Sequence, residues 1–144
     1  MNYSCLTELT DHGPNPYVAN MEQLEQRNTN FRTAIWTGEH LQMTLMCIPS
    51  FGEIGLENHK DTDQVIRIEE GNAIVRMGKC KNHLDVQRSV CKGDIVFVPA
   101  GIWHNITNVE RNPLKISSIY APPHHPRGTV HRTKADEERE HFYM

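Results

Sequence analysis

The stretch GDIVFVPAGIWHNITN, residues 93–108, carries the pattern that decides the fold. It runs through residues of alternating polarity to Pro99, reverses in the Ala-Gly turn that follows, and continues into a second alternating segment. In that second segment His104 shares a strand face with Ile102 and Ile106. The stretch therefore predicts two strands joined by a tight turn, with one histidine on an otherwise apolar inward face.

Outside this stretch, short segments of alternating polarity follow one another between turn signals, without a helical period. A run of about nine short strands predicts an antiparallel sandwich or barrel. A closed double-sheet barrel is favoured because it leaves few strand edges unpaired. The expected strands are FRTAIW (31–36), LQMTLMCI (41–48), IGLENH (54–59), QVIRIEE (64–70), AIVRM (73–77), DVQRSV (85–90), DIVFV (94–98), WHNITN (103–108) and LKISSIYA (114–121).

The 144 residues are expected to form one domain with a central barrel and two flanking segments. Residues 1–30 read as an extended arm followed by a short helix, for which Asn20 is the expected cap. Residues 31–121 form the barrel. Residues 122–144 read as a proline- and histidine-rich coil followed by a short helix, whose charged run DEERE (136–140) we expect to face solvent.

The composition argues against several classes of function. A formal net charge of −3, without a run of basic residues, is unlike a protein that binds nucleic acid. No stretch approaches the roughly 20 apolar residues of a membrane span, and the N-terminus lacks a basic start followed by an apolar run. We therefore expect no membrane partner and a cytoplasmic location. The cysteines contain no C-x-x-C pair and are expected to be reduced thiols: Cys5, Cys47, Cys80 and Cys91.

A second group of polar residues lies around the beginning of the strand expected at 64–70. Gln64 shares its strand face with two isoleucines, so it should point inward. Glu57 and His59 are two positions apart, so an extended segment would direct both toward the same volume. A metal ion is one of the few partners that satisfies a buried carboxylate together with an imidazole and an amide.

Two alternatives remain open for this group. Glu53, Asp61 and Asp63 are nearby carboxylates that would replace Glu57 if the strand register slipped. Gln64, a rare metal ligand, would in the other alternative orient a bound water or donate a hydrogen bond to Glu57.

The sequence resembles the cupin superfamily in its two conserved motifs. The second motif is complete, with Gly93, Pro99, Gly101, His104 and Asn108 at its spacing. The first motif is altered: its first histidine position holds Glu57, its second holds His59, and its glutamate position holds Gln64. The resemblance implies a double-stranded β-helix, or jelly-roll, barrel of the RmlC-like type. It also implies one divalent metal ion held by Glu57, His59, Gln64 and His104.

Across residues 40–121 the chain looks most like small single-domain cupins labelled as relatives of mannose-6-phosphate isomerase. This resemblance implies a metal-dependent enzyme that acts on a small polar metabolite such as a sugar or sugar phosphate, by isomerase or epimerase chemistry. Two histidines with oxygen ligands suit Zn, Mn, Fe, Ni or Co. The alternatives are an Fe(II)-type dioxygenase, a non-catalytic protein that binds or senses a small ligand, and a structural barrel without an ion.

The last strand and the tail supply candidate proton-transfer groups. Tyr120 lies on the inward face of its strand, where it is either a proton donor or an ordinary wall residue. His124, His125 and His131 either cap the open end of the barrel or pack with the tail on its outside. A homodimer is expected because small cupins commonly pair through a sheet face and because the N-terminal arm has little else to pack on.

Overall fold

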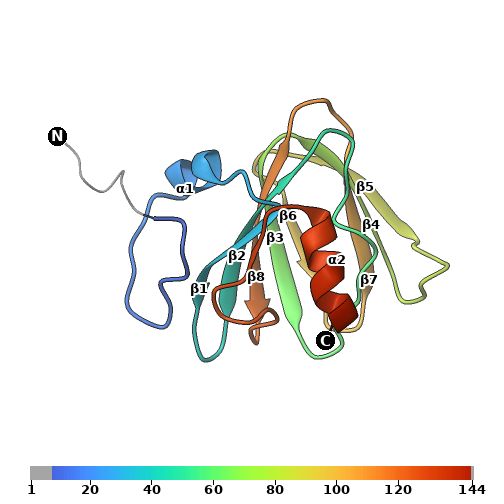
Figure 1. Cartoon of the computed structure of the whole chain (residues 1–144). Helices are drawn as coiled ribbons and strands as arrows, with labels where there is room; N and C mark the ends of the chain where they lie inside the picture. The colour runs from blue at the N-terminus through green and yellow to red at the C-terminus, as the bar shows by residue number, and fades with distance from the viewer. Residues whose placement is uncertain (1–7, 144) are drawn as a thin grey trace.

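The computed structural model describes residues 8–143, which form nine strands and two helices (Figure 1). The elements in chain order are α1 (Met21–Arg27), β1 (Arg32–Thr37), β2 (Gln42–Ile48), β3 (Asp63–Glu70), β4 (Asn72–Gly78), β5 (Val86–Cys91), β6 (Ile95–Val98), β7 (Trp103–Asn108), β8 (Leu114–Ala121), β9 (Val130–His131) and α2 (Lys134–Tyr143).

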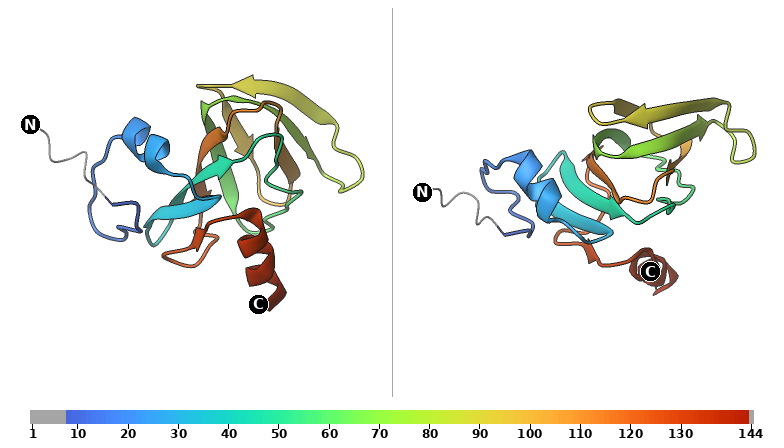
Figure 2. Two further views of the ribbon diagram at one scale, coloured as in Figure 1. Left: turned by 45° about the horizontal axis from the view of Figure 1, so that its top comes forward. Right: turned by 90° about the horizontal axis from the view of Figure 1, so that it is seen from above.

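Antiparallel pairing builds two sheets that face each other across the core. The larger sheet has the strand order β6-β3-β8-β2-β1-β9, and the smaller has β5-β4-β7. Figure 2 shows the smaller sheet on one side of the barrel and β1 and β2, with α1 beside them, on the other. Alternate residues of both sheets fill the space between them, among them Ile66, Val75, Ile106 and Ile116. The predicted all-β double-sheet barrel is therefore confirmed.

The residues of the 93–108 motif shape the turns of this barrel. Gly93 and Gly101 have φ values of 92° and 85°, a region that glycine adopts without strain. The buried Asn108 side chain donates to the carbonyl oxygens of Ile48, Pro49 and Asn112 at 3.2, 3.0 and 2.9 Å. Asn108 thereby ties the end of β7 to the chain that leaves β2 and to the turn before β8.

One expected strand is wrong. Residues 54–59 form no strand, and only single bridges pair Glu53 with Thr107 and Glu57 with His104. Gly55 lies between these bridges with a φ of 99°, which interrupts the extended conformation that a continuous ladder needs. The segment still runs alongside β7, so its side chains reach the same interior.

The predicted N-terminal helix is present as α1. The Asn20 side chain accepts a hydrogen bond from the backbone N–H of Gln23 at 3.0 Å, as expected of a helix cap. The described part of the N-terminal arm packs on its own chain, because the Trp36 indole N–H donates to the carbonyl of Asn15 at 2.8 Å. Within residues 8–143 no helix has the length and apolar character needed to cross a bilayer.

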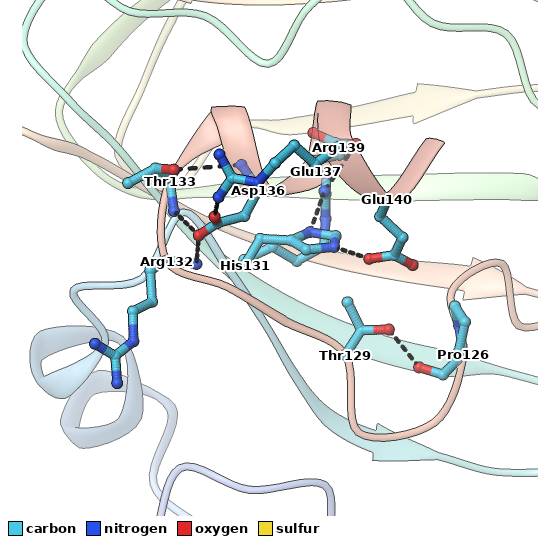
Figure 3. Close-up of polar contacts among 10 residues, drawn as sticks. Pro126, Thr129, His131, Arg132, Thr133, Asp136, Glu137, Arg139 and Glu140 are labelled. Carbon is cyan, nitrogen blue, oxygen red and sulfur yellow. Dashed lines mark hydrogen bonds and ion pairs between the residues drawn. The ribbon is translucent and has the colours of Figure 1, made fainter. Parts of the chain in front are cut away.

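The tail is more ordered than the sequence predicts. The coil expected after residue 121 contains β9, which pairs with β1 at the edge of the larger sheet. The predicted C-terminal helix is present as α2, and its N-terminus is capped reciprocally (Figure 3). The Asp136 carboxylate accepts from the backbone N–H of Thr133 at 3.1 Å, and the Asp136 N–H donates to the Thr133 hydroxyl at 3.3 Å.

Candidate metal centre

Glu57 and His104 are held side by side by their backbones. The N–H of each residue donates to the carbonyl oxygen of the other at 2.9 Å, so the 54–59 segment and β7 meet at this pair. Opposed residues of antiparallel strands place their side chains on the same side. A carboxylate and an imidazole, supplied by segments distant in sequence, thereby reach one volume inside the barrel.

His59 completes the group from the same segment. The backbone N–H of Gly101 donates to the His59 carbonyl at 2.9 Å, which fastens the segment to the turn between β6 and β7. The His59 and His104 rings lie 5.2 Å apart between centroids. One ligand atom each from Glu57, His59 and His104 falls within 4.8 Å of the other two. These three residues can hold a metal ion.

The hydrogen bond of His104 assigns its tautomer. Nδ1 lies 3.1 Å from the carbonyl oxygen of Ile102, so it carries the proton and donates it there. Nε2 therefore keeps its lone pair, and it is buried without a hydrogen-bond partner among the described residues. Burial lowers the pKa of His104, so the ring is neutral at physiological pH. A neutral imidazole of this kind is the form that binds metals.

Glu57 is a half-buried carboxylate with incomplete compensation. Burial raises its pKa from 4.5 to about 7, the positive charges of Arg32 and Lys134 oppose this rise, and Glu137 adds to it. Burying a carboxylate is costly unless a cation or several hydrogen bonds offset the loss of water. A divalent ion between Glu57 and the two histidines meets that need and uses the lone pair of His104, so the residues present fit a metal.

Gln64 lies close to this group on β3. Its side chain is buried, its Nε2 donates to the Ser118 hydroxyl at 3.3 Å, and its Oε1 receives no hydrogen bond from any residue between 8 and 143. Gln64 is paired with Tyr120 across the β3 and β8 register. The amide oxygen is available, and its ligation of the ion stays a prediction.

The alternative carboxylates are used elsewhere. The Asp63 carboxylate accepts from the backbone N–H of Ala100 at 2.9 Å, and Glu53 lies 3.7 Å from the ammonium of Lys134. Among the described residues neither these two nor Asp61 joins a cluster that can hold a metal. The register therefore did not slip, and Glu57 is the carboxylate that reaches the two histidines.

Tyr120 and His124 lie against His59, and His125 lies against Tyr120. The Tyr120 and His124 rings lie 5.8 and 4.0 Å from the His59 ring, and the His125 ring lies 5.2 Å from Tyr120. Burial raises the pKa of Tyr120, which keeps its hydroxyl protonated. Burial also lowers the pKa of His125 strongly, with a further contribution from Arg32, so that ring is neutral. Glu57, His59 and His104 together are called the metal group. The beginning of the tail thus lies over this group and not on the outside of the barrel.

Gln42 positions His124 and His125, a role that was not predicted from the sequence. Its buried side chain accepts from the backbone N–H groups of His124 and His125 at 3.2 and 2.9 Å, and donates to the His125 carbonyl at 2.9 Å. Arg32, fully buried on β1, was missed as well. The available signal was strand alternation, which places Gln42 on the same face as Thr44 and Met46.

The remaining tail residues correct a further expectation. The run DEERE does not face solvent throughout, because the Glu137 side chain is only 7% exposed and lies 2.9 Å from the guanidinium of Arg32. His131 contacts Glu140 of the same helix and Arg32. The buried charge of Arg32 needs an anionic partner, so Glu137 is buried although the run consists only of charged residues.

Comparisons with known proteins agree with this architecture. The model of the cupin domain matches residues 44–120, more than half of the chain. YrkC, an uncharacterized protein of Bacillus subtilis, is 54% identical over 128 residues, covering 89% of this chain and 69% of that protein. The uncharacterized protein L612 of Acanthamoeba polyphaga mimivirus is 38% identical over 115 residues, covering 79% and 70%.

A solved structure is similar as well. The crystal structure of BH2720 from Bacillus halodurans superposes with a TM-score of 0.89 at 51% sequence identity, covering 90% of this chain and 98% of that one. The residues that match the family model include both cupin motifs, the altered first motif with Glu57 and the complete second motif with His104. The chain therefore belongs to the cupin family.

Proposed function

We propose that this cupin is a metal-dependent enzyme that acts on a small polar metabolite, such as a sugar or sugar phosphate, by isomerase or epimerase chemistry. The observation that supports it most is the meeting of Glu57, His59 and His104 next to Tyr120 and His124. A metal group next to an imidazole and a protonated phenol contains the parts that a proton-transfer reaction needs.

The proposed ligands are Glu57, His59, Gln64 and His104, a set of two nitrogen and two oxygen donors. A divalent Zn, Mn, Fe, Ni or Co ion suits this mixture, and six-fold coordination would leave about two positions for substrate or water. When bound, such an ion polarises a carbonyl or hydroxyl oxygen of the substrate. The Nδ1 hydrogen bond of His104 to Ile102 orients the imidazole for this task.

The residues of this chain would move the proton. Isomerisation or epimerisation next to a carbonyl requires a base that removes a carbon-bound proton and an acid that protonates an oxygen or the opposite face. His124, whose ring lies 4.0 Å from that of His59, is the proposed base, and His125 is the second candidate, because its strongly lowered pKa makes its ring a weak base. Tyr120, whose raised pKa keeps its hydroxyl protonated, is the proposed acid.

The test is deuterium exchange in D₂O, followed by NMR, on protein loaded with each divalent ion and mixed with a panel of aldoses, ketoses, their phosphates and sugar acids. We expect deuterium at the carbon next to the carbonyl, in proportion to metal content. Tyr120→Phe should lower the rate by about 10²-fold or more, whereas the matched control Tyr17→Phe, in the N-terminal arm, should leave it unchanged. No exchange with any ion or sugar would contradict the proposal.

A dioxygenase is the second candidate, favoured by the ligand types. Two histidines and one carboxylate are the donors of many non-haem Fe(II) oxygenases, and Glu57, His59 and His104 are of these types. Oxygen uptake that depends on Fe(II) and on one compound of a substrate panel would identify it. Saturable ligand binding without turnover in either assay would point to the non-catalytic alternative.

We also propose that the chain forms a homodimer through the outer face of the larger sheet. Phe97, Val65, Ile119 and Met43 lie directly opposite one another in register across four adjacent strands. Phe97 is 66% exposed at one end of this row. The other three residues are half-buried, so the row is a partly accessible apolar strip of the kind that protein interfaces cover.

Light scattering after size exclusion tests the dimer. Twice the chain mass of 16.6 kDa is expected for the wild type, and Phe97→Ser should shift the protein toward monomer. Phe51→Ser is the matched control, because Phe51 is 62% exposed in a loop away from this row. A wild-type monomer would contradict the proposal.

A cytoplasmic location is proposed too, supported by the free thiols of Cys47, Cys80 and Cys91. Cys5 lies outside the residues that the structure describes.

A further inference from the structure

Arg32 is a fully buried cation that faces the barrel interior. On β1 it is paired with Met46, a core residue whose sulfur lies 3.5 Å from Nη2. The Nη1 atom lies 2.9 Å from a carboxylate oxygen of Glu137 and 3.3 Å from Nδ1 of His131. The Nε atom has no hydrogen-bond partner within the described part of the chain. One carboxylate from the C-terminal helix is thus the nearest compensation for this charge.

Arg32 belongs to the same interior as the metal group. A continuous series of ring contacts connects them: His59 to Tyr120 at 5.8 Å, Tyr120 to His125 at 5.2 Å, and His125 to His131 at 6.3 Å, after which His131 contacts Arg32. The positive charge of Arg32 also acts against the rise in the pKa of Glu57. A small ligand at the metal group would therefore lie within the field of this guanidinium.

The described side chains of the helix that supplies Glu137, residues 134–140, attach it mainly by charge. Among residues 134–140, Glu137 is the one buried side chain, and none of the seven is a large apolar residue. Figure 1 shows α2 across the front of the barrel, and Figure 3 shows Glu137 and Glu140 on the side of the helix that faces His131. With no apolar face among residues 134–140, this described part of α2 has less to hold it than the strands it covers.

We infer that Arg32 is the anion-recognition residue of the barrel interior, and that Glu137 occupies the position that the carboxylate of a small organic acid takes when α2 moves away. An exposed charge could be left to water, but a buried guanidinium needs an anion at all times. Its planar fork of N–H donors matches a carboxylate in two-point contact. A substrate acid would restore the same pairing that Glu137 provides, so exchange of the two leaves Arg32 compensated.

This inference rests on the proposed function, because the other end of the ligand would reach the metal group. It narrows the substrate class of that function. Among small polar metabolites it selects those that carry a carboxylate, such as sugar acids and short hydroxy or keto acids. Neutral sugars have no group that replaces Glu137, and they would leave Arg32 bound to its own helix.

Calorimetric titration of the full chain tests the exchange. The probes are glyceric acid, glycerol phosphate and neutral glycerol, each titrated into wild type, Glu137→Gln and Glu138→Gln. Glu138 lies next to Glu137 on α2 and is exposed, so it matches the change in charge without the contact to Arg32. We expect Glu137→Gln to bind glyceric acid at least about tenfold more tightly than wild type, because the tethered carboxylate that competes for Arg32 has been removed. Glu138→Gln should bind it with the affinity of the wild type.

Two further measurements separate this inference from the metal proposal. The gain for Glu137→Gln should persist after chelation of all metal, because Arg32 and not the ion recognises the carboxylate. Adding Arg32→Lys to Glu137→Gln should abolish the gain, and circular dichroism should show that the barrel is kept. Equal affinities of wild type and Glu137→Gln, an equal gain for glycerol, or a gain for glycerol phosphate alone would overturn the assignment. Metal content measured on the same samples reports on the proposed function independently.

Discussion

Replacing Glu57 by glutamine should stabilise the metal-free protein at neutral and alkaline pH but not at acid pH. The pKa of Glu57 is raised from 4.5 to about 7 by burial. Between these two values the folded chain keeps a proton that the unfolded chain has released, so the free energy of unfolding of the wild type falls as the pH rises. Glutamine has nearly the same shape and no carboxyl proton to lose. All other ionisable groups are shared, so the difference between the two proteins isolates Glu57.

The magnitude follows from the size of the shift. Raising a pKa from 4.5 to about 7 corresponds to about 3 kcal/mol at 25 °C. That difference should be absent below about pH 4.5 and complete above about pH 7. In a chain of this length, 1 kcal/mol moves the melting temperature by about 3 °C. The metal-free variant should therefore melt about 10 °C above the wild type at alkaline pH.

The assay is urea unfolding of chelator-treated protein at several pH values between about 4.5 and 8.5. Glu53→Gln is the matched control, because Glu53 lies in the same loop with a side chain 46% exposed; it should show no pH-dependent gain. Adding zinc should reverse the order at alkaline pH, since the ion stabilises the wild type through the Glu57 carboxylate. A difference between wild type and Glu57→Gln that is the same at every pH would refute the reasoning.

Three other substitutions test the remaining parts of the site. His104→Ala should lose bound metal while circular dichroism shows the barrel retained; full metal content by elemental analysis would remove His104 from the site. Asn108→Ala should lower the free energy of unfolding by about 2–4 kcal/mol in urea, because one buried and two part-buried hydrogen bonds to carbonyl groups are lost; an unchanged midpoint would contradict that role. Gln42→Leu should keep the metal but lower activity at least about tenfold, because it releases the backbone of residues 124–125; unaltered kinetics would show that Gln42 does not position this pair.

Strand alternation explains why much of the fold was predictable. Eight of the nine expected strands are present, since a period of two is a local property that neighbouring residues display by themselves. The same rule correctly placed Gln64 and His104 on buried faces. It failed at residues 54–59, where the positive φ of Gly55 interrupts the strand. It also missed β9, whose two residues are too few to show a period.

The positions of Glu57 and His104 along the chain do not by themselves bring the two side chains together. Backbone hydrogen bonds between two separate segments do so, and these bonds depend on the register of the whole barrel. The meeting could be expected only because the residues resemble a known motif. The structure supplies the cause, because the loop before β3 is fastened both to β7 and to the turn at Gly101.

By itself the sequence determined the class of fold, the two short helices and the inward direction of the histidine, amide and tyrosine side chains, because local alternation and capping carry that information. Only the tertiary structure decided which groups meet: Arg32 with Glu137, and the tail histidines with His59. Such pairs join residues far apart in the chain, by 99 positions for Arg32 and His131. A charge in a terminal helix looks the same in sequence whether water or a buried guanidinium lies opposite it, and packing of the complete chain makes that choice.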